Sequence, residues 1–216
     1  MELVLIRHGT TSGNQTHRHQ PEYGRLTKEG RAEAAALAEY VTAFNPTVLL
    51  SSTHVRALET AAIISQDTDM IPSTSALFTE LHRPQYMYGQ FHRSWHTYKY
   101  LAGWYLGRIG SSVATDVDLE GESYRIFQAR VSEAVRVLEA YPRDARIVVV
   151  THAVFISFLI HYLTTGHRVR LWHLPQFMIN IFTIKNGSAT TLRYDEATGH
   201  WHKVAYHEGG DLVRGT

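Results

Sequence analysis

Five side chains of this sequence have the chemistry and the placement to act on a phosphate group. Arg7 and His8 follow the first apolar run, Arg56 follows the second, and His152 follows the run RIVVV. Guanidinium groups bind phosphate oxygens through paired hydrogen bonds. Nearby positive charge disfavours protonation of a histidine, and a neutral imidazole is a competent nucleophile toward phosphorus. The second histidine could stabilise the transferring group, and Glu80 could protonate the leaving oxygen. These residue types therefore predict phosphoryl transfer.

Such chemistry needs strands that bring the five residues together. Three short apolar runs, at residues 3–6, 47–52 and 146–150, are expected to be parallel strands. Ligands of an open α/β sheet bind beyond the carboxyl ends of its strands, so the residues that follow these runs should converge in one crevice. The run Ala76–Leu81 could form a further strand, with Glu80 near its end. Gly9 is expected to let the backbone approach the bound anion closely.

Segments with helical spacing alternate with the expected strands. Thr27 is predicted to be the N-cap of the first of them. Helices are expected over residues 28–44, 53–66, 122–141 and 153–165. After Gly166 the chain is rich in β-forming residues, and Asn186-Gly187 predicts a hairpin there. We expect an α/β fold over residues 1–216 as one domain: a three-layer α/β/α sandwich with a mostly parallel central sheet and an antiparallel edge.

Residues 82–120 interrupt this alternation. The segment is crowded with tyrosine, tryptophan, histidine and arginine, and we interpret it as a helical, lid-like insertion. Such aromatic side chains commonly pack within a lid or serve a homodimer contact. We hypothesise that the insertion selects the substrate, with Arg83 as an additional cationic contact.

The composition limits the classes of function. Lys plus Arg number 21 and Asp plus Glu number 20, a net charge of +1 that argues against a nucleic-acid partner. The absence of cysteine excludes disulfides, Cys-ligated zinc and thiol chemistry. The longest apolar stretch, Ile147–Leu163, contains two histidines and is shorter than the roughly 20 residues of a membrane span. No signal-peptide layout is present, so we expect a cytoplasmic protein without a membrane partner.

Two groups of histidines could ligate a metal. They are His17 with His19, and His92 with His96 at helical spacing. Neither group has a carboxylate partner, and we interpret them as solvent-facing loop and lid residues. No metal or other cofactor is expected.

The chain resembles the histidine phosphatase superfamily, within it the phosphoglycerate-mutase-like group. The resemblance is carried, in the family's order, by RHGTTSGN, LTKEGRAEA, SSTHVRALETA, the glutamate of TELHRP, GESYRIFQARV and VVTHA. It implies that His8 is the phosphorylated nucleophile, and that Arg7, Arg56 and His152 form the phosphate pocket.

Further roles follow from the same resemblance. Glu80 matches the proton donor, with Glu122 and Glu59 as rivals. Asn14 matches a phosphate-binding position, and Thr11 and Ser12 match positions that often line the site.

The resemblance also implies a reaction. It is transfer of a phosphoryl group to His8 followed by hydrolysis, as in a metal-independent phosphomonoesterase acting on a small phosphorylated metabolite. Ala153 replaces the glycine that usually follows the second histidine, and the apolar residues after it favour the phosphatase branch. The alternatives are a phosphoglycerate-type mutase, a non-catalytic binder of phosphorylated ligands and, ranked lower, a phosphoprotein phosphatase.

Overall fold

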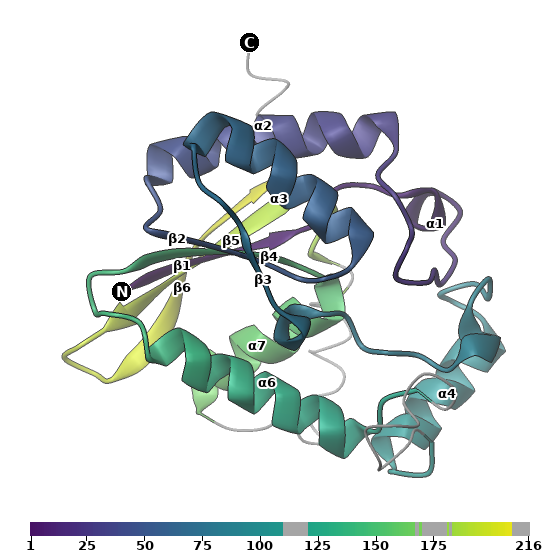
Figure 1. Cartoon of the computed structure of the whole chain (residues 1–216). Helices are drawn as coiled ribbons and strands as arrows, with labels where there is room; N and C mark the ends of the chain where they lie inside the picture. Colours follow the sequence, from purple (N-terminus) through teal and green to yellow (C-terminus); the bar gives the residue numbers. More distant parts are fainter. Residues whose placement is uncertain (110–120, 167–168, 170–180, 182, 209–216) are drawn as a thin grey trace.

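A sheet lies in the middle of the molecule, and helices cover both of its faces (Figure 1). The computed structural model of the chain describes residues 1–109, 121–166, 169, 181 and 183–208. Within these residues, six strands are hydrogen-bonded in the order β3-β2-β4-β1-β5-β6. The strands are β1 (Glu2–Arg7), β2 (Val48–Ser51), β3 (Ser73–Thr74), β4 (Arg146–Thr151), β5 (Ser188–Asp195) and β6 (His200–Glu208).

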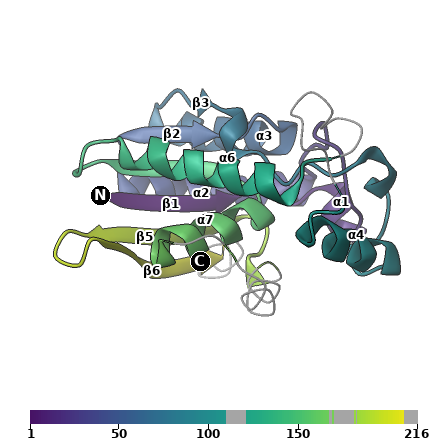
Figure 2. The same cartoon turned by 90° about the horizontal axis from the view of Figure 1, so that it is seen from below.

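The pairing of the strands confirms the predicted sheet. Strands β1 to β4 run parallel, and β5 and β6 add an antiparallel edge beside β1. Arg7 and Thr151, the last residues of β1 and β4, are paired with each other, and Ser51 at the end of β2 is paired with Val150. The chain therefore leaves three neighbouring strands at one edge of the sheet. Helices α1 (Ser12–Gln15) and α4 (Trp95–Tyr105) lie beyond that edge in both views (Figures 1 and 2).

Alternation of side chains along the strands divides the core into two layers. Val4 and Ile6 pack with apolar residues of α2 (Lys28–Phe44) and α3 (Val55–Thr68). Leu3 and Leu5 pack on the other face with those of α6 (Tyr124–Glu139) and α7 (Ala153–Thr165). All four of these β1 side chains are fully buried. The result is the predicted three-layer α/β/α arrangement (Figure 1).

The expected helices are present. Helices α2 and α7 have the predicted bounds, and α3 and α6 differ slightly at their ends. The Thr27 side chain accepts a hydrogen bond from the Gly30 backbone amide, which confirms Thr27 as the N-cap of α2. The apolar stretch 147–163 is strand β4 followed by helix α7. None of the helices that the structure describes is both long and apolar enough to cross a membrane.

The strand predicted at Ala76–Leu81 is wrong. Ala76–Phe78 is a short 3-10 helix, η1, and the two-residue strand β3 lies before it. The Ser75 side chain accepts a hydrogen bond from the Leu77 amide, and this cap starts a tight turn where the apolar pattern had suggested a strand. Glu80 follows η1 in a segment without regular structure.

The hairpin predicted at Asn186-Gly187 is also misplaced. Strands β5 and β6 do form a hairpin, but its turn lies at residues 196–199, and Asn186-Gly187 comes before β5. Gly187 has a φ of 60°, the left-handed conformation that this dipeptide favours. The dipeptide thus marks a genuine turn, but one that does not join the two strands.

The insertion, residues 82–120, is described up to residue 109, and its remaining residues, 110–120, lie outside the described residues. Its described part holds a 3-10 helix, η2 (Gln85–Met87), and α4. The Gly89 amide donates to the His19 carbonyl at 2.8 Å, and the His19 amide donates to the Gln90 carbonyl at 2.9 Å. These bonds fasten the insertion to the loop that follows α1.

Candidate active site

The two histidines that follow β1 and β4 lie side by side. Because Arg7 and Thr151 are paired in the sheet, the next residues, His8 and His152, leave it at the same level. Their ring centroids are 5.0 Å apart. Both side chains are buried, with exposed fractions of 4% for His8 and 0% for His152. The structure therefore brings together the two imidazoles that the sequence placed at strand ends.

The hydrogen bonds of His8 fix which ring nitrogen carries the proton. Arg56 Nε donates to His8 Nε2 at 3.2 Å, and an arginine can only donate, so Nε2 presents its lone pair. The other nitrogen, Nδ1, lies 2.8 Å from the Gly9 carbonyl oxygen, to which it donates its proton. Nε2, the ring nitrogen that carries no proton, therefore faces the Arg56 guanidinium.

Arg56 is held in place by three different partners. Besides His8, it donates from NH1 to the Pro21 carbonyl at 3.0 Å and from NH2 to His54 Nδ1 at 3.0 Å. It stands in the first turn of α3, and only 4% of it is exposed. The sequence placed Arg56 correctly, and the structure adds that its guanidinium is oriented before any ligand arrives.

Arg7 and His152 each have a buried nitrogen without a hydrogen-bond partner among the described residues. These nitrogens are Arg7 Nε and His152 Nδ1. Arg7 uses NH1 to donate to the Ile184 carbonyl at 2.6 Å. His152 Nε2 lies 2.8 Å from the Ser52 hydroxyl, which can donate to it and so leave the proton on Nδ1. Each residue thus has a further donor for an anion.

The electrostatic environment keeps the two imidazoles neutral. Burial lowers the pKa of His8 well below its ordinary value, and the charges of Arg56 and Arg7 lower it further. Burial likewise lowers the pKa of His152, and Arg56 and His8 add to the effect. Burial also lowers the pKa of Arg56, to about 10, so its guanidinium remains charged at neutral pH.

Glu80 lies at the start of α7, beside the phosphate-binding candidates. Its Oε2 accepts from the Val154 amide and its Oε1 from the Phe155 amide, both at 3.2 Å. A carboxylate at this position satisfies amides that the helix leaves unpaired. Glu80 also lines a small cavity together with Arg56 and Arg83.

The two rival carboxylates are engaged elsewhere. Glu59 pairs with Arg25 and Arg31 at 3.1 and 2.9 Å. Glu122 is bound by Arg130 at 2.7 Å. Neither of them lines the cavity in which Glu80 is found.

The residues expected to contact the substrate differ in their positions. Asn14 Oδ1 accepts hydrogen bonds from the Thr11 amide and hydroxyl and from Asn186 Nδ2, so this oxygen is committed to the loop itself. Thr11 is fully buried, whereas Ser12 is exposed. Arg83 lines the cavity, and its buried Nε has no hydrogen-bond partner among the described residues. Their substrate-binding roles remain predictions.

Gly9 and Gly30 allow two backbone segments to approach each other closely. A Cβ atom on Gly9 would lie 2.2 Å from the Gly30 carbonyl oxygen, and one on Gly30 would lie 2.1 Å from the Thr10 carbonyl oxygen. Two glycines therefore let the first turn of α2 press against the loop after β1. The close approach in this structure is between the loop after β1 and the first turn of α2.

Sequence reasoning missed two residues that touch this machinery. His54 accepts the hydrogen bond from Arg56, its ring centroid lies 4.8 Å from that of His152, and its Nε2 lies 3.6 Å from Glu22 Oε1. Asn186 Nδ2 donates to the His8 carbonyl at 3.1 Å. His54 stands two residues before Arg56, a nearness that could have drawn attention to it. The Asn186 contact spans most of the chain and leaves no local signal.

His19 and His92, one from each histidine group considered for a metal, lie with their ring centroids 4.6 Å apart. Among the residues described, no three histidine, aspartate or glutamate side chains are arranged to hold a metal ion. The view of these histidines as solvent-facing is wrong for His19, which is buried, with Nε2 3.0 Å from the Thr97 hydroxyl. Burial lowers the pKa of His19 to about 2.

Comparison with known proteins identifies the family. The model of the histidine phosphatase superfamily (branch 1) matches residues 3–206, nearly the whole chain. The chain therefore belongs to the histidine phosphatase superfamily. A curated relative, the 8-oxo-(d)GTP phosphatase of Mycolicibacterium smegmatis, is 31% identical over 78 residues, which are 36% of this chain. The match spans about a quarter, 24%, of the length of that relative.

Solved structures share the fold. A phosphoserine phosphatase mutant from Entamoeba histolytica has a TM-score of 0.72 at 21% identity, covering 96% of this chain and 97% of that one. The alpha-ribazole phosphatase from Shigella flexneri has a TM-score of 0.71 at 20% identity, covering 97% of both chains. A mycobacterial glucosyl-3-phosphoglycerate phosphatase has a TM-score of 0.70 at 23% identity, covering 94% of this chain and 97% of that one.

Proposed function

We propose that this member of the histidine phosphatase superfamily is a metal-independent phosphomonoesterase that hydrolyses a small phosphorylated metabolite through a phosphohistidine on His8. The observation that carries the proposal is the hydrogen bonding of the His8 ring. Gly9 holds the Nδ1 proton, and the Nε2 lone pair faces the Arg56 guanidinium, a group suited to bind the phosphate under attack.

In the first step, the Arg56 guanidinium exchanges its hydrogen bond to His8 for bonds to the phosphoryl oxygens. His8 Nε2 forms the N–P bond as the P–O bond to the leaving group breaks. Glu80 delivers a proton to the leaving oxygen, so the alcohol departs neutral. Arg7, Arg56 and His152 stabilise the charge on the transferring group through donors that are already in place.

In the second step, water replaces the alcohol. The Glu80 carboxylate takes a proton from the water as its oxygen bonds to phosphorus, and the N–P bond breaks with its electron pair returning to Nε2. Inorganic phosphate and the original enzyme result. The solved relatives and the curated relative described above are all named as phosphatases, which supports hydrolysis over transfer to a second substrate.

Phosphate release tests the proposal. We expect the wild type to release phosphate from p-nitrophenyl phosphate at the same rate with and without EDTA, and His8→Ala to release none. His200→Ala, at an exposed position on β6, is the matched control and should behave as the wild type. Release abolished by EDTA, or preserved in His8→Ala, would show the proposal to be wrong. Interconversion of phosphoglycerates without phosphate release would identify a mutase.

A further inference from the structure

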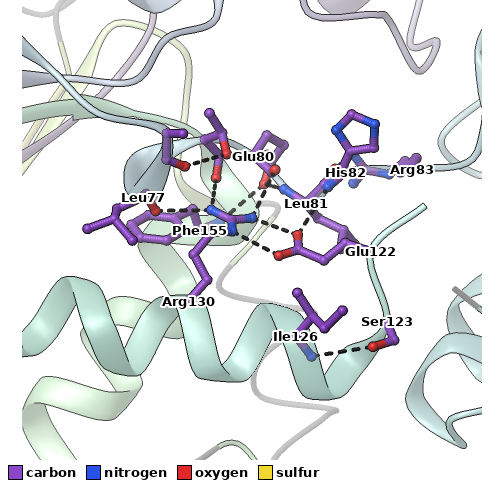
Figure 3. Close-up of polar contacts among 12 residues, drawn as sticks. Leu77, Glu80, Leu81, His82, Arg83, Glu122, Ser123, Ile126, Arg130 and Phe155 are labelled. Atoms are coloured by element: carbon purple, nitrogen blue, oxygen red, sulfur yellow. Dashed lines mark hydrogen bonds and ion pairs between the residues drawn. The ribbon is translucent and has the colours of Figure 1, made fainter. Parts of the chain in front are cut away.

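An arginine outside the phosphate pocket has all of its donors in use. Arg130 of α6 donates from Nε to Glu122 Oε1 at 2.9 Å, from NH2 to Glu122 Oε2 at 2.7 Å and from NH2 to the Glu80 carbonyl at 3.2 Å. Its NH1 donates to the carbonyls of Leu77 and Thr79 at 3.0 and 2.8 Å. A guanidinium has five N–H groups, and each has its own acceptor here (Figure 3).

The three carbonyls belong to the segment that carries Glu80. Glu122 binds the same segment two residues after Glu80: its amide donates to the His82 carbonyl at 2.8 Å and its Oε2 accepts from the His82 amide at 3.4 Å. Figure 3 shows Arg130 and Glu122 facing each other beneath this segment. The side chain of Glu122 is 4% exposed and that of Arg130 is 15% exposed.

Stability alone does not explain why Arg130 and Glu122 form a buried ion pair with so many bonds to this segment. Burial of an ion pair costs desolvation that its attraction only partly offsets, so such a pair is weak evidence of a stabilising role. The segment lacks regular secondary structure after η1, and these bonds replace the backbone partners that a strand would have supplied. What the bonds specify is the path of the backbone on which Glu80 stands.

We propose that Arg130 and Glu122 are positioning residues that set the place of the proton donor. The inference rests on the proposed function, in which Glu80 protonates the leaving oxygen. Glu80 is then fixed at both ends: its carboxylate by the first amides of α7, and its backbone by the guanidinium of Arg130. Proton transfer needs a separation of about 2.6–3.2 Å between heavy atoms. A misplacement of about 1 Å can cost about 100-fold in rate.

The need for a proton donor depends on the leaving group. A comparison of two leaving groups can therefore distinguish the positioning of Glu80 from a general structural role of Arg130 and Glu122. An alkyl phosphate such as glycerol phosphate releases a basic alkoxide that must be protonated, whereas p-nitrophenolate is stable without a proton. Glu80→Gln should therefore lower kcat/KM, which covers the steps up to phosphorylation of His8, far more for the alkyl ester than for the aryl ester. Variants that merely displace Glu80 should show the same selectivity.

The test uses Arg130→Lys and Glu122→Gln in the full chain. Lysine keeps the positive charge opposite Glu122 but offers three donors on one nitrogen, which cannot reach acceptors on both sides. For each variant, kcat/KM is measured for glycerol phosphate and p-nitrophenyl phosphate, because it reports the steps up to phosphorylation of His8 and excludes the later hydrolysis that both esters share. We expect a loss of about 10- to 100-fold in kcat/KM for the alkyl ester and a nearly unchanged kcat/KM for the aryl ester. Arg136→Lys is the control, because Arg136 lies on the same helix in an exposed pair with Glu133.

Each outcome bears on one of the two claims. Equal losses on both esters, or no loss on either, would overturn the positioning role while leaving the phosphatase proposal intact. If Arg130→Lys does not fold and Glu122→Gln shows no selectivity between the esters, the arginine supports the fold only and the inference is wrong. If the wild type hydrolyses neither ester, or if His8→Ala retains activity, the proposed function itself fails.

Discussion

Replacement of Arg56 separates the geometric role of its guanidinium from the role of its charge. Arg56 directs three hydrogen bonds to His8, His54 and Pro21, each from a different nitrogen. A lysine ammonium keeps the charge but has all its donors on one atom, so it cannot span these partners or bind two phosphoryl oxygens side by side. Arg56→Lys therefore removes at least one donor that is in place before the reaction.

The loss can be sized from comparable sites. Removal of one preorganised donor to a transition state costs about 10²–10³ in kcat, which is about 2.7–4 kcal/mol. We expect a loss of this size in Arg56→Lys, measured as kcat on p-nitrophenyl phosphate. Arg56→Met should lose at least as much, since it removes the charge as well.

The two variants should differ in their dependence on pH. Arg56 is among the causes that lower the pKa of His8, second to burial. His8 must be neutral to attack, so activity falls as the pH drops through its pKa. Loss of the charge in Arg56→Met raises that pKa and moves the acid limb of the kcat/KM profile to higher pH. Arg56→Lys keeps the charge and should leave the limb in place. A wild-type kcat in Arg56→Lys, or an unshifted acid limb in Arg56→Met, would refute this reasoning.

Three further substitutions probe the surroundings of the phosphate pocket. His54→Phe removes an acceptor of Arg56, and a charged hydrogen bond contributes about 1.5–3 kcal/mol. Inorganic phosphate should therefore inhibit the variant about 10- to 100-fold more weakly than the wild type. An unchanged inhibition constant would refute the role of His54. Gly30→Ala forces a Cβ to within 2.1 Å of a backbone oxygen, and the free energy of unfolding in urea should fall by about 1–3 kcal/mol. The exposed Lys28→Ala serves as its control, and equal effects of the two would contradict the packing argument. Asn186→Ala removes one donor from the His8 and Gly9 carbonyls, which keep the Gly187 amide and His8 Nδ1 as donors. The free energy of unfolding should fall by about 0.5–1.5 kcal/mol, and a value equal to the wild type would contradict a stabilising role of the Asn186 amide.

The parts of the site that the sequence predicts are those set by the ends of strands. Arg7, His8 and His152 could be placed together because parallel strands deliver their following residues to one edge, and the register of Arg7 with Thr151 bears this out. The α/β fold and the limits of α2 and α7 followed from apolar spacing and from the cap at Thr27. The strands and helices follow from local patterns in the chain, and the general rule for parallel strands then brings their distant ends together.

The parts that the sequence does not predict depend on contacts between distant segments. Asn186 was assigned to a hairpin by the dipeptide Asn-Gly, and nothing local reveals that its amide reaches His8. The apolar run before Glu80 suggested a strand, but Arg130 supplies the partners that hold the segment in an irregular path. Glu122 was a rival proton donor because carboxylates look alike in a sequence, and only its pairing with Arg130 tells the two apart.

Detection of a phosphoryl group on His8 tests the central claim most directly. The wild type would be mixed rapidly with p-nitrophenyl phosphate, quenched with alkali and examined by mass spectrometry of its peptides. We predict one phosphoryl group on the peptide that contains His8, stable in alkali and lost in acid as a phosphohistidine is, and its absence from His8→Ala. Phosphate released with no phosphorylated peptide in the first turnover, or a phosphoryl group on another residue, would contradict the account.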